Sequence, residues 1–239
     1  EIEGYIRRGF TAFKMKIGRT SNNHKMRLQF MNNGDFYLTP EEDKARIELV
    51  RRTIGPDKTL MVDMNCTWDL DDVLNAKEFF VQNDIFMVEE PIRSDDTAGY
   101  IRLTKELGGI KVAGIESEQG VSRFAELIKA DAMDVVQASL GWAGGFTGCR
   151  NIASTAHAFN KLYTPHSFFS AVMTAANIQF AASQVNIPFI EAEENENPLR
   201  TELLKEPIET DEHMNYYITD KPGLGIELDL DVIEKYIIK

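Results

Sequence analysis

The sequence lacks several features that would place it in a common class of protein. It has only two cysteines, Cys66 and Cys149, among 239 residues. Two cysteines are too few for a disulfide framework, and they fit a reducing cytoplasm. No apolar run reaches about 18 residues, so we expect no membrane-spanning helix, and no signal peptide opens the sequence. The sequence also does not begin with methionine, and its first ten residues look like the end of a helix, so we expect residues to be missing upstream.

Positive charge is also scarce. Lysine and arginine together number 26 against 38 acidic residues, which gives a formal net charge of −12. A strongly acidic chain repels nucleic acid and anionic membrane surfaces, so neither is an expected partner. An anionic substrate would need local lysines or a metal cation to bind.

Three short apolar runs each end in a carboxylate. The runs are Thr59–Asp63, Phe86–Glu89 and Val112–Glu116, and their acidic residues stand 26 and 27 positions apart. Each run lacks a polar face, as a buried parallel strand does, and Pro91 ends the second because proline cannot donate a ladder hydrogen bond. One such end could equally be a solvated loop, but the repeat favours a functional set.

The same unit repeats along the chain, with predicted helices near 40–54, 70–83, 98–107, 121–130, 146–160 and 171–184. Seven strands are predicted, with ends near Lys16, Asp63, Glu89, Glu116, Ser139, His166 and Glu191. Such alternation indicates a parallel sheet. Polar residues at every strand end are typical of a TIM-type barrel, whereas a doubly wound sheet gathers them at one switch point. We therefore predict an α/β fold, a (β/α) barrel over 1–239 with a C-terminal extension from about 195.

Two lysines share one face of the first predicted strand. Lys14 and Lys16 alternate with apolar residues, so both point to the same side, although a solvated edge strand would show the same pattern. A polar insertion at about 19–40 follows. Loops of this length are often lids over a site, and we expect its His24 and Arg27 to face solvent.

The acidic strand ends predict a metal site. Asp63, Glu89 and Glu116 would repel one another if they met without a cation. Three carboxylates leave octahedral positions open for water and substrate, which suits one Mg²⁺ per site. Lys16 and His166 then stand as general acid–base groups on opposite sides of the barrel mouth. Lys14 and the cation would lower the pKa of Lys16 toward neutrality.

Taken in order, these motifs resemble the enolase superfamily, and in particular its mandelate racemase-like branch. They are Lys14-x-Lys16, Asp63-x-Asn65, Glu89-Glu90-Pro91, Glu116, Gly144-Gly145, Pro165-His166 and the closing stretch Pro222–Glu227. The resemblance covers nearly the whole chain outside 19–40. It implies a (β/α)7β barrel whose first strand and N-terminal capping domain are absent here, so that this chain is part of a longer polypeptide.

The resemblance also implies an activity, which is Mg²⁺-assisted removal of the proton α to a carboxylate. Asp63, Glu89 and Glu116 would bind the metal, Lys16 would be a base with Lys14 as its electrostatic partner, and His166 the opposite acid or base. Glu191, Asn65 and Ser139 would contact the small-molecule carboxylate substrate. Members of this family usually form symmetric homo-oligomers, and we expect the same here.

Two residues depart from the family pattern. Ser139 stands where the branch pairs its histidine with aspartate, and a serine can orient an imidazole but stabilises its charged form less than a carboxylate does. His166 is therefore expected to serve as an acid better than as a base. Ile115 stands where glycine is usual, and we expect some crowding before Glu116.

Three functions stay open at this point. Dehydration of an acid sugar, an aldonate or aldarate, to a 2-keto-3-deoxy acid ranks first because it needs His166 only as an acid. Racemisation or epimerisation of a 2-hydroxy acid ranks second because it needs two bases. A metal-binding barrel without catalysis is third. The muconate cycloisomerase-like branch is disfavoured, because its strand-six lysine has no counterpart between Val135 and Gly145.

Overall fold

The computed structural model describes residues 1–18 and 39–237. The predicted insertion at 19–40, with His24 and Arg27, lies almost wholly outside these residues. By contacts between Cα atoms the chain divides into two compact units. Unit 1 contains residues 1–115 and 129–135, and unit 2 contains residues 116–128 and 136–239. No helix in the described ranges has the length and hydrophobicity needed to cross a membrane.

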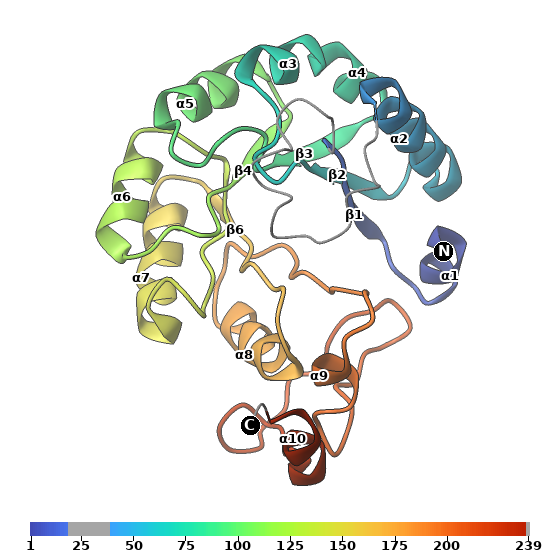
Figure 1. Cartoon of the computed structure of the whole chain (residues 1–239). Coiled ribbons are helices and arrows are strands. Elements are labelled where there is room, and N and C mark those ends of the chain that lie inside the picture. Colours follow the sequence, from blue (N-terminus) through green and yellow to red (C-terminus); the bar gives the residue numbers. More distant parts are fainter. Residues whose placement is uncertain (19–38, 238–239) are drawn as a thin grey trace. The chain divides into compact units, whose positions relative to one another are not determined.

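Unit 1 alternates parallel strands with helices. Its elements are α1 (Ile2–Arg7), β1 (Ala12–Lys16), α2 (Pro40–Ile54), β2 (Thr59–Asp63), α3 (Leu70–Asn75), α4 (Lys77–Gln82), β3 (Ile85–Glu89), α5 (Thr97–Glu106) and β4 (Lys111–Gly114). Strands β1 to β4 pair in parallel in chain order. Helices α2 to α5 lie along the outer side of these strands (Figure 1). The predicted helix at 70–83 is two helices that meet at Ala76.

The core of unit 1 follows from its strand sequences. Leu60, Val62 and Val88 are fully buried, as expected of parallel strands that are covered on both faces. Helix α2 begins with a capping box, in which the Thr39 hydroxyl accepts from the Glu42 N–H and the Glu42 carboxylate accepts from the Thr39 N–H. This reciprocal pair satisfies two backbone donors that the helix itself leaves unbonded.

Arg51 of helix α2 donates hydrogen bonds to four backbone carbonyls of unit 1. Its guanidinium donates to the carbonyls of Asn83, Gly55, Lys58 and Asp84 at 2.7–2.9 Å. Lys58 immediately precedes β2 and Asp84 immediately precedes β3. The side chain is 13% exposed, so these bonds are partly shielded from water and fix the segments that lead into both strands.

Unit 2 contains mostly helices. Its elements are α7 (Gly145–Ala158), β6 (Leu162–Tyr163), α8 (Ala171–Ala182), α9 (Pro198–Thr201) and α10 (Leu230–Tyr236), and it holds most of α6 (Val121–Lys129). Tyr163 packs edge-on against Phe180 of α8 at 5.5 Å between ring centroids. Its hydroxyl donates to the Ala138 carbonyl at 2.6 Å. The predicted extension from about 195 holds α9, α10 and two isolated antiparallel bridges.

The described residues form six strands in the order β1-β2-β3-β4-β5-β6, not the seven predicted. Strand β5 (Val135–Val136) is joined to β4 through the Asp134 N–H and the Val112 carbonyl, and to β6 through the Thr164 N–H and the Val136 carbonyl. The prediction of a strand at 187–190 was wrong. Proline at position 188 has no N–H to donate, and the Tyr163 N–H bonds instead to the Asn186 carbonyl, which precedes that segment.

Candidate functional site

The register of unit 1 brings the predicted residues of three strands together. Lys16 of β1 lies opposite Asp63 of β2, and Asp63 lies opposite Glu89 of β3. All three are the last residues of their strands. Because parallel strands end at the same edge, the base and two acids predicted from the sequence occupy one edge of the sheet.

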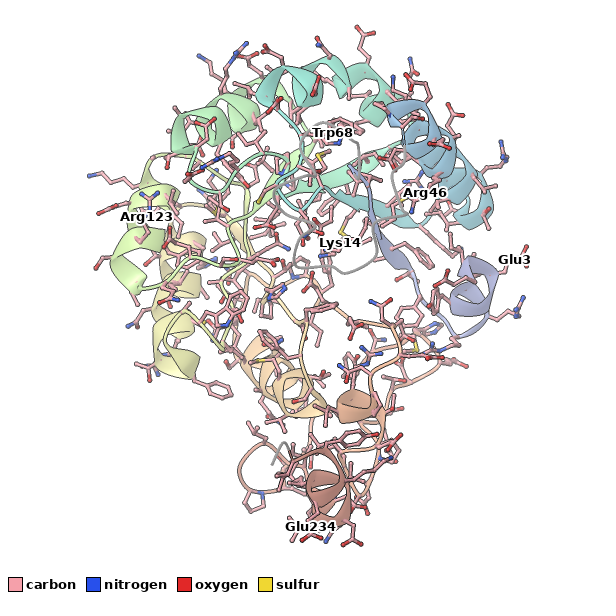
Figure 2. All side chains as sticks on the ribbon, in the orientation of Figure 1. Glu3, Lys14, Arg46, Trp68, Arg123 and Glu234 are labelled. Carbon is pink, nitrogen blue, oxygen red and sulfur yellow. The ribbon has the colours of Figure 1, made fainter. Side chains whose placement is uncertain are left out.

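The side chains of these strand ends are in direct contact. Lys14 Nζ lies 2.5 Å from Glu89 Oε1 and 3.8 Å from Asp63 Oδ2, and Lys16 Nζ contacts Asp63 Oδ2. Both carboxylates are fully buried, whereas the Lys16 side chain is 46% exposed. Figure 2 labels Lys14 where it leaves β1. Two buried acids are thus compensated by two lysines, one of which still reaches solvent.

Charge controls the protonation of this cluster. Burial by itself raises the pKa of Asp63, but the positive charges of Lys14 and Lys16 outweigh it, so the pKa lies below its ordinary value. The pKa of the neighbouring Glu90 is raised, first by burial and then by the charge of Asp63. Asp63 therefore stays ionised near neutral pH, as a metal ligand or a partner of a lysine must.

A second set of contacts, which the sequence did not reveal, fixes the chain just after Lys16. Asp43 in the first turn of α2 is 1% exposed, and its Oδ2 accepts from the Gly18 N–H at 2.7 Å. Arg46 NH1 donates to Asp43 Oδ1 at 2.9 Å and to the Lys16 carbonyl at 3.1 Å. Gly18 has φ +83°, and a Cβ there would lie 2.4 Å from Thr67 Oγ1. Arg46 is labelled on α2 in Figure 2.

Removal of Asp43 should loosen this attachment. Asp43→Ala leaves the Gly18 N–H without its acceptor, and we expect the free energy of unfolding in urea to fall by about 1–3 kcal/mol. Glu41→Ala is the matched control, because Glu41 is an exposed acid of the same helical turn. The control should lose only the interaction of its charge with the helix dipole, about 0.3–1 kcal/mol. Equal losses in the two variants would contradict the role given to Asp43.

In unit 2, Glu116 and His166 are in contact. His166 Nε2 lies 3.2 Å from Glu116 Oε1, and both side chains are largely buried. Ile115, just before Glu116, has φ +63°, and Gly114 has φ +137°. A β-branched residue rarely adopts a positive φ, so the glycine that the resemblance implies for position 115 would suit this backbone conformation. The predicted effect of Ile115 is therefore conformational strain in addition to crowding.

The three predicted substrate-binding residues have different surroundings. Asn65 is exposed, and its N–H donates to Asp63 Oδ1 at 2.8 Å. Ser139 is buried, and its Oγ accepts from the Gly141 N–H at 3.2 Å. Glu191 Oε2 accepts from the Ser167 N–H at 2.6 Å, which ties Glu191 to the segment that carries His166. Their contacts with substrate stay predictions.

The residues of unit 1 fit a hard divalent cation. Asp63 and Glu89 already share one cation, the Lys14 ammonium, and carboxylate oxygens are the ligands that Mg²⁺ prefers. Within residues 1–18 and 39–237 no group of three or more histidine, cysteine or acidic side chains is gathered around one point. Glu116 as a third ligand therefore stays a prediction.

The whole barrel region can be compared with known proteins. Residues 1–232 match the family model described as enolase C-terminal domain-like. The chain belongs to this family. The resemblance noted in the strand-end motifs is therefore confirmed, and with it the enolase-superfamily, mandelate racemase-like assignment. The α/β, barrel-like fold class predicted from the sequence is confirmed as well.

Two relatives of the chain are named for an acid sugar and for the lactone of one. The chain is 29% identical over 235 residues to arabinonate dehydratase of Saccharolobus solfataricus, and 32% identical over 238 residues to D-galactarolactone cycloisomerase of Agrobacterium fabrum. The matches cover 98% and 95% of this chain. The chain spans 57% of the length of each of these relatives.

Solved structures of the superfamily share the fold. A 3,6-anhydro-D-galactonate cycloisomerase from Zobellia galactanivorans superposes with a TM-score of 0.86 at 29% identity, over 100% of this chain and 62% of that one. A racemase from Streptomyces coelicolor with bound magnesium gives a TM-score of 0.80 at 25% identity, over 98% and 57%. Magnesium is thus present in one relative of known structure.

Proposed function

We propose that this protein removes the proton α to a carboxylate with the help of Mg²⁺, and that its reaction is the dehydration of an aldonate or aldarate to a 2-keto-3-deoxy acid. The observation that carries the proposal is the contact of Lys16, Lys14, Asp63 and Glu89 at one edge of the sheet. The names of the relatives, which include a dehydratase and cycloisomerases, support an acid-sugar substrate.

In the first step Lys16 Nζ takes the α-proton, and the electron pair of the C–H bond delocalises into the substrate carboxylate to give an enediolate. Lys16 acts here as the neutral amine, and it suits this role because its side chain reaches solvent beside Asp63, a proposed metal ligand. Lys14 is less exposed and bonded to Glu89, so it supplies positive charge. In the second step the C–O bond to the β-hydroxyl breaks, His166 donates a proton, and water leaves. The resulting enol takes up a proton at the β-carbon and releases its hydroxyl proton to become the keto acid.

Asp63, Glu89 and Glu116 are the proposed metal ligands. When bound, a magnesium ion would supply positive charge beside the substrate carboxylate, which makes the α-C–H more acidic. The buried carboxylates of Asp63 and Glu89 would hold that charge in place, and Asp63 stays ionised because its pKa is lowered by Lys14 and Lys16. Asn65, Ser139 and Glu191 are proposed to orient the substrate.

A screen of aldonates and aldarates with MgCl₂ tests the proposal. We expect at least one acid to give a 2-keto-3-deoxy product, detected as a semicarbazone and by the loss of one water in mass spectrometry. A product that has lost no water and that gains one α-deuterium in D₂O would replace the dehydratase with the racemase or another isomerase. Magnesium binding with neither product nor deuterium exchange across the library would support the non-catalytic alternative.

A further inference from the structure

Unit 2 places an indole ring against the imidazole of His166. The ring centroids of Trp142 and His166 are 5.7 Å apart with an interplanar angle of 28°. Phe169 meets both rings edge-on, at 5.7 Å from His166 and 5.6 Å from Trp142. We infer that Trp142 is a positioning residue that holds the imidazole of His166 by stacking on it. This inference rests on the proposed role of His166 as the acid of the reaction.

The turn that carries Trp142 is firmly built. The Ser139 carbonyl accepts from the N–H groups of Trp142 at 3.1 Å and Ala143 at 2.8 Å, and Ser139 Oγ accepts from the Gly141 N–H at 3.2 Å. A Cβ at Gly141 would lie 3.1 Å from the Met173 methyl group. The indole is therefore held from its backbone, and Ser139 acts on the imidazole through this turn.

The stacked ring supplies a constraint that the Glu116 contact lacks. The carboxylate of Glu116 meets His166 at Nε2, and a contact at one ring atom does not by itself fix the plane of the ring. The indole face fixes the plane of the imidazole, and the edge of Phe169 limits its sideways movement. Core packing accounts poorly for this indole, because Trp142 stays 40% exposed while His166 is 8% exposed.

The test combines a spectroscopic and a kinetic measurement on two variants of Trp142. Trp142→Leu keeps an apolar side chain but removes the aromatic ring, and Trp142→Phe keeps a smaller aromatic ring. Phe159→Leu is the matched control, because Phe159 is an exposed aromatic residue of the same unit, at the end of α7. In ¹³C-histidine-labelled protein, His166 ring signals are assigned with His166→Asn. We expect an upfield ring-current shift that is lost in Trp142→Leu, partly kept in Trp142→Phe and unchanged in Phe159→Leu.

With an acid sugar that the screen identifies, Trp142→Leu should lower kcat for the keto acid about two- to tenfold, the worth of one aromatic pair, with KM unchanged. The ratio of α-deuterium exchange to product should rise, because the enediolate returns to substrate more often when the acid is misplaced. An unchanged His166 spectrum in Trp142→Leu, or a raised KM with the same kcat, would overturn the inference. Wild-type enzyme that makes no keto acid would instead refute the proposed function, and the spectrum would still report on the stacking.

Discussion

Replacement of Lys16 by alanine should reduce the exchange of the substrate α-proton with deuterated solvent by about 10²–10⁴-fold, the usual contribution of a general base. The Lys16 side chain is 46% exposed, whereas the Asp63 carboxylate that its Nζ contacts is fully buried. Without it, no lysine of comparable reach ends β1, since Lys14 is held by Glu89 at 2.5 Å. The exchange is followed by NMR of the substrate in D₂O.

Two further variants make this result specific. Lys16→Arg keeps the positive charge beside Asp63, but a guanidinium stays protonated at any ordinary pH and cannot accept the proton. It should therefore be as inactive as Lys16→Ala while it retains magnesium binding. Lys105→Ala, which removes an exposed lysine from α5 of the same unit, should exchange at the wild-type rate. Retained exchange in Lys16→Arg would remove Lys16 from the role of base.

Glu89→Gln should weaken magnesium binding by more than about 100-fold, because loss of a direct ligand exceeds the 10- to 100-fold cost of an outer partner. Glutamine keeps the shape of the side chain but not its charge, and the Glu89 carboxylate is fully buried at the end of β3. Isothermal titration with MgCl₂ measures the affinity. A melting curve with and without the metal then shows whether the variant is folded.

Glu90 offers a matched control for this experiment. It is the next residue, it is also buried, and its pKa is raised by burial and by the charge of Asp63. Glu90→Gln should bind magnesium with wild-type affinity, because Glu90 is not a proposed ligand. If both variants lost the metal equally, the effect would reflect general damage to this segment. If Glu89→Gln bound it normally, Glu89 would not be a ligand.

The parts of the site that could be predicted are those that depend on a short, local pattern of apolar and polar residues. An apolar run that ends in a polar residue indicates both a buried strand and the place where it stops, so Lys16, Asp63 and Glu89 could be predicted as strand ends. The register that pairs them comes from the structure. The strand at 187–190 failed for a local reason that was visible, since a proline stands at position 188. Its apolar neighbours fit the pattern of a buried strand, but the proline lacks the N–H that a paired strand donates.

Contacts between distant segments could not be predicted. Asp43 is one of three acids in the first turn of α2, and only the structure shows it buried against Gly18, 25 positions away. The partner of His166 could not be predicted either, because Ser139 stands where the resemblance implies an aspartate. The sequence offered no carboxylate at that position for His166, and the structure supplies one from Glu116, 50 positions earlier in the chain. Neither pairing leaves a periodic signal.

The four carbonyls bound by Arg51 have a consequence for how this protein could change over time. They lie where the chain enters β2 and β3, whereas Asp63 and Glu89 lie where it leaves them. The attachment of these strands is therefore secured at the end remote from their reactive groups. Mutations at the reactive ends could therefore change substrate preference while Arg51 keeps the other ends of β2 and β3 in place. Residues that determine specificity and residues that determine stability then lie at opposite ends of the same two strands.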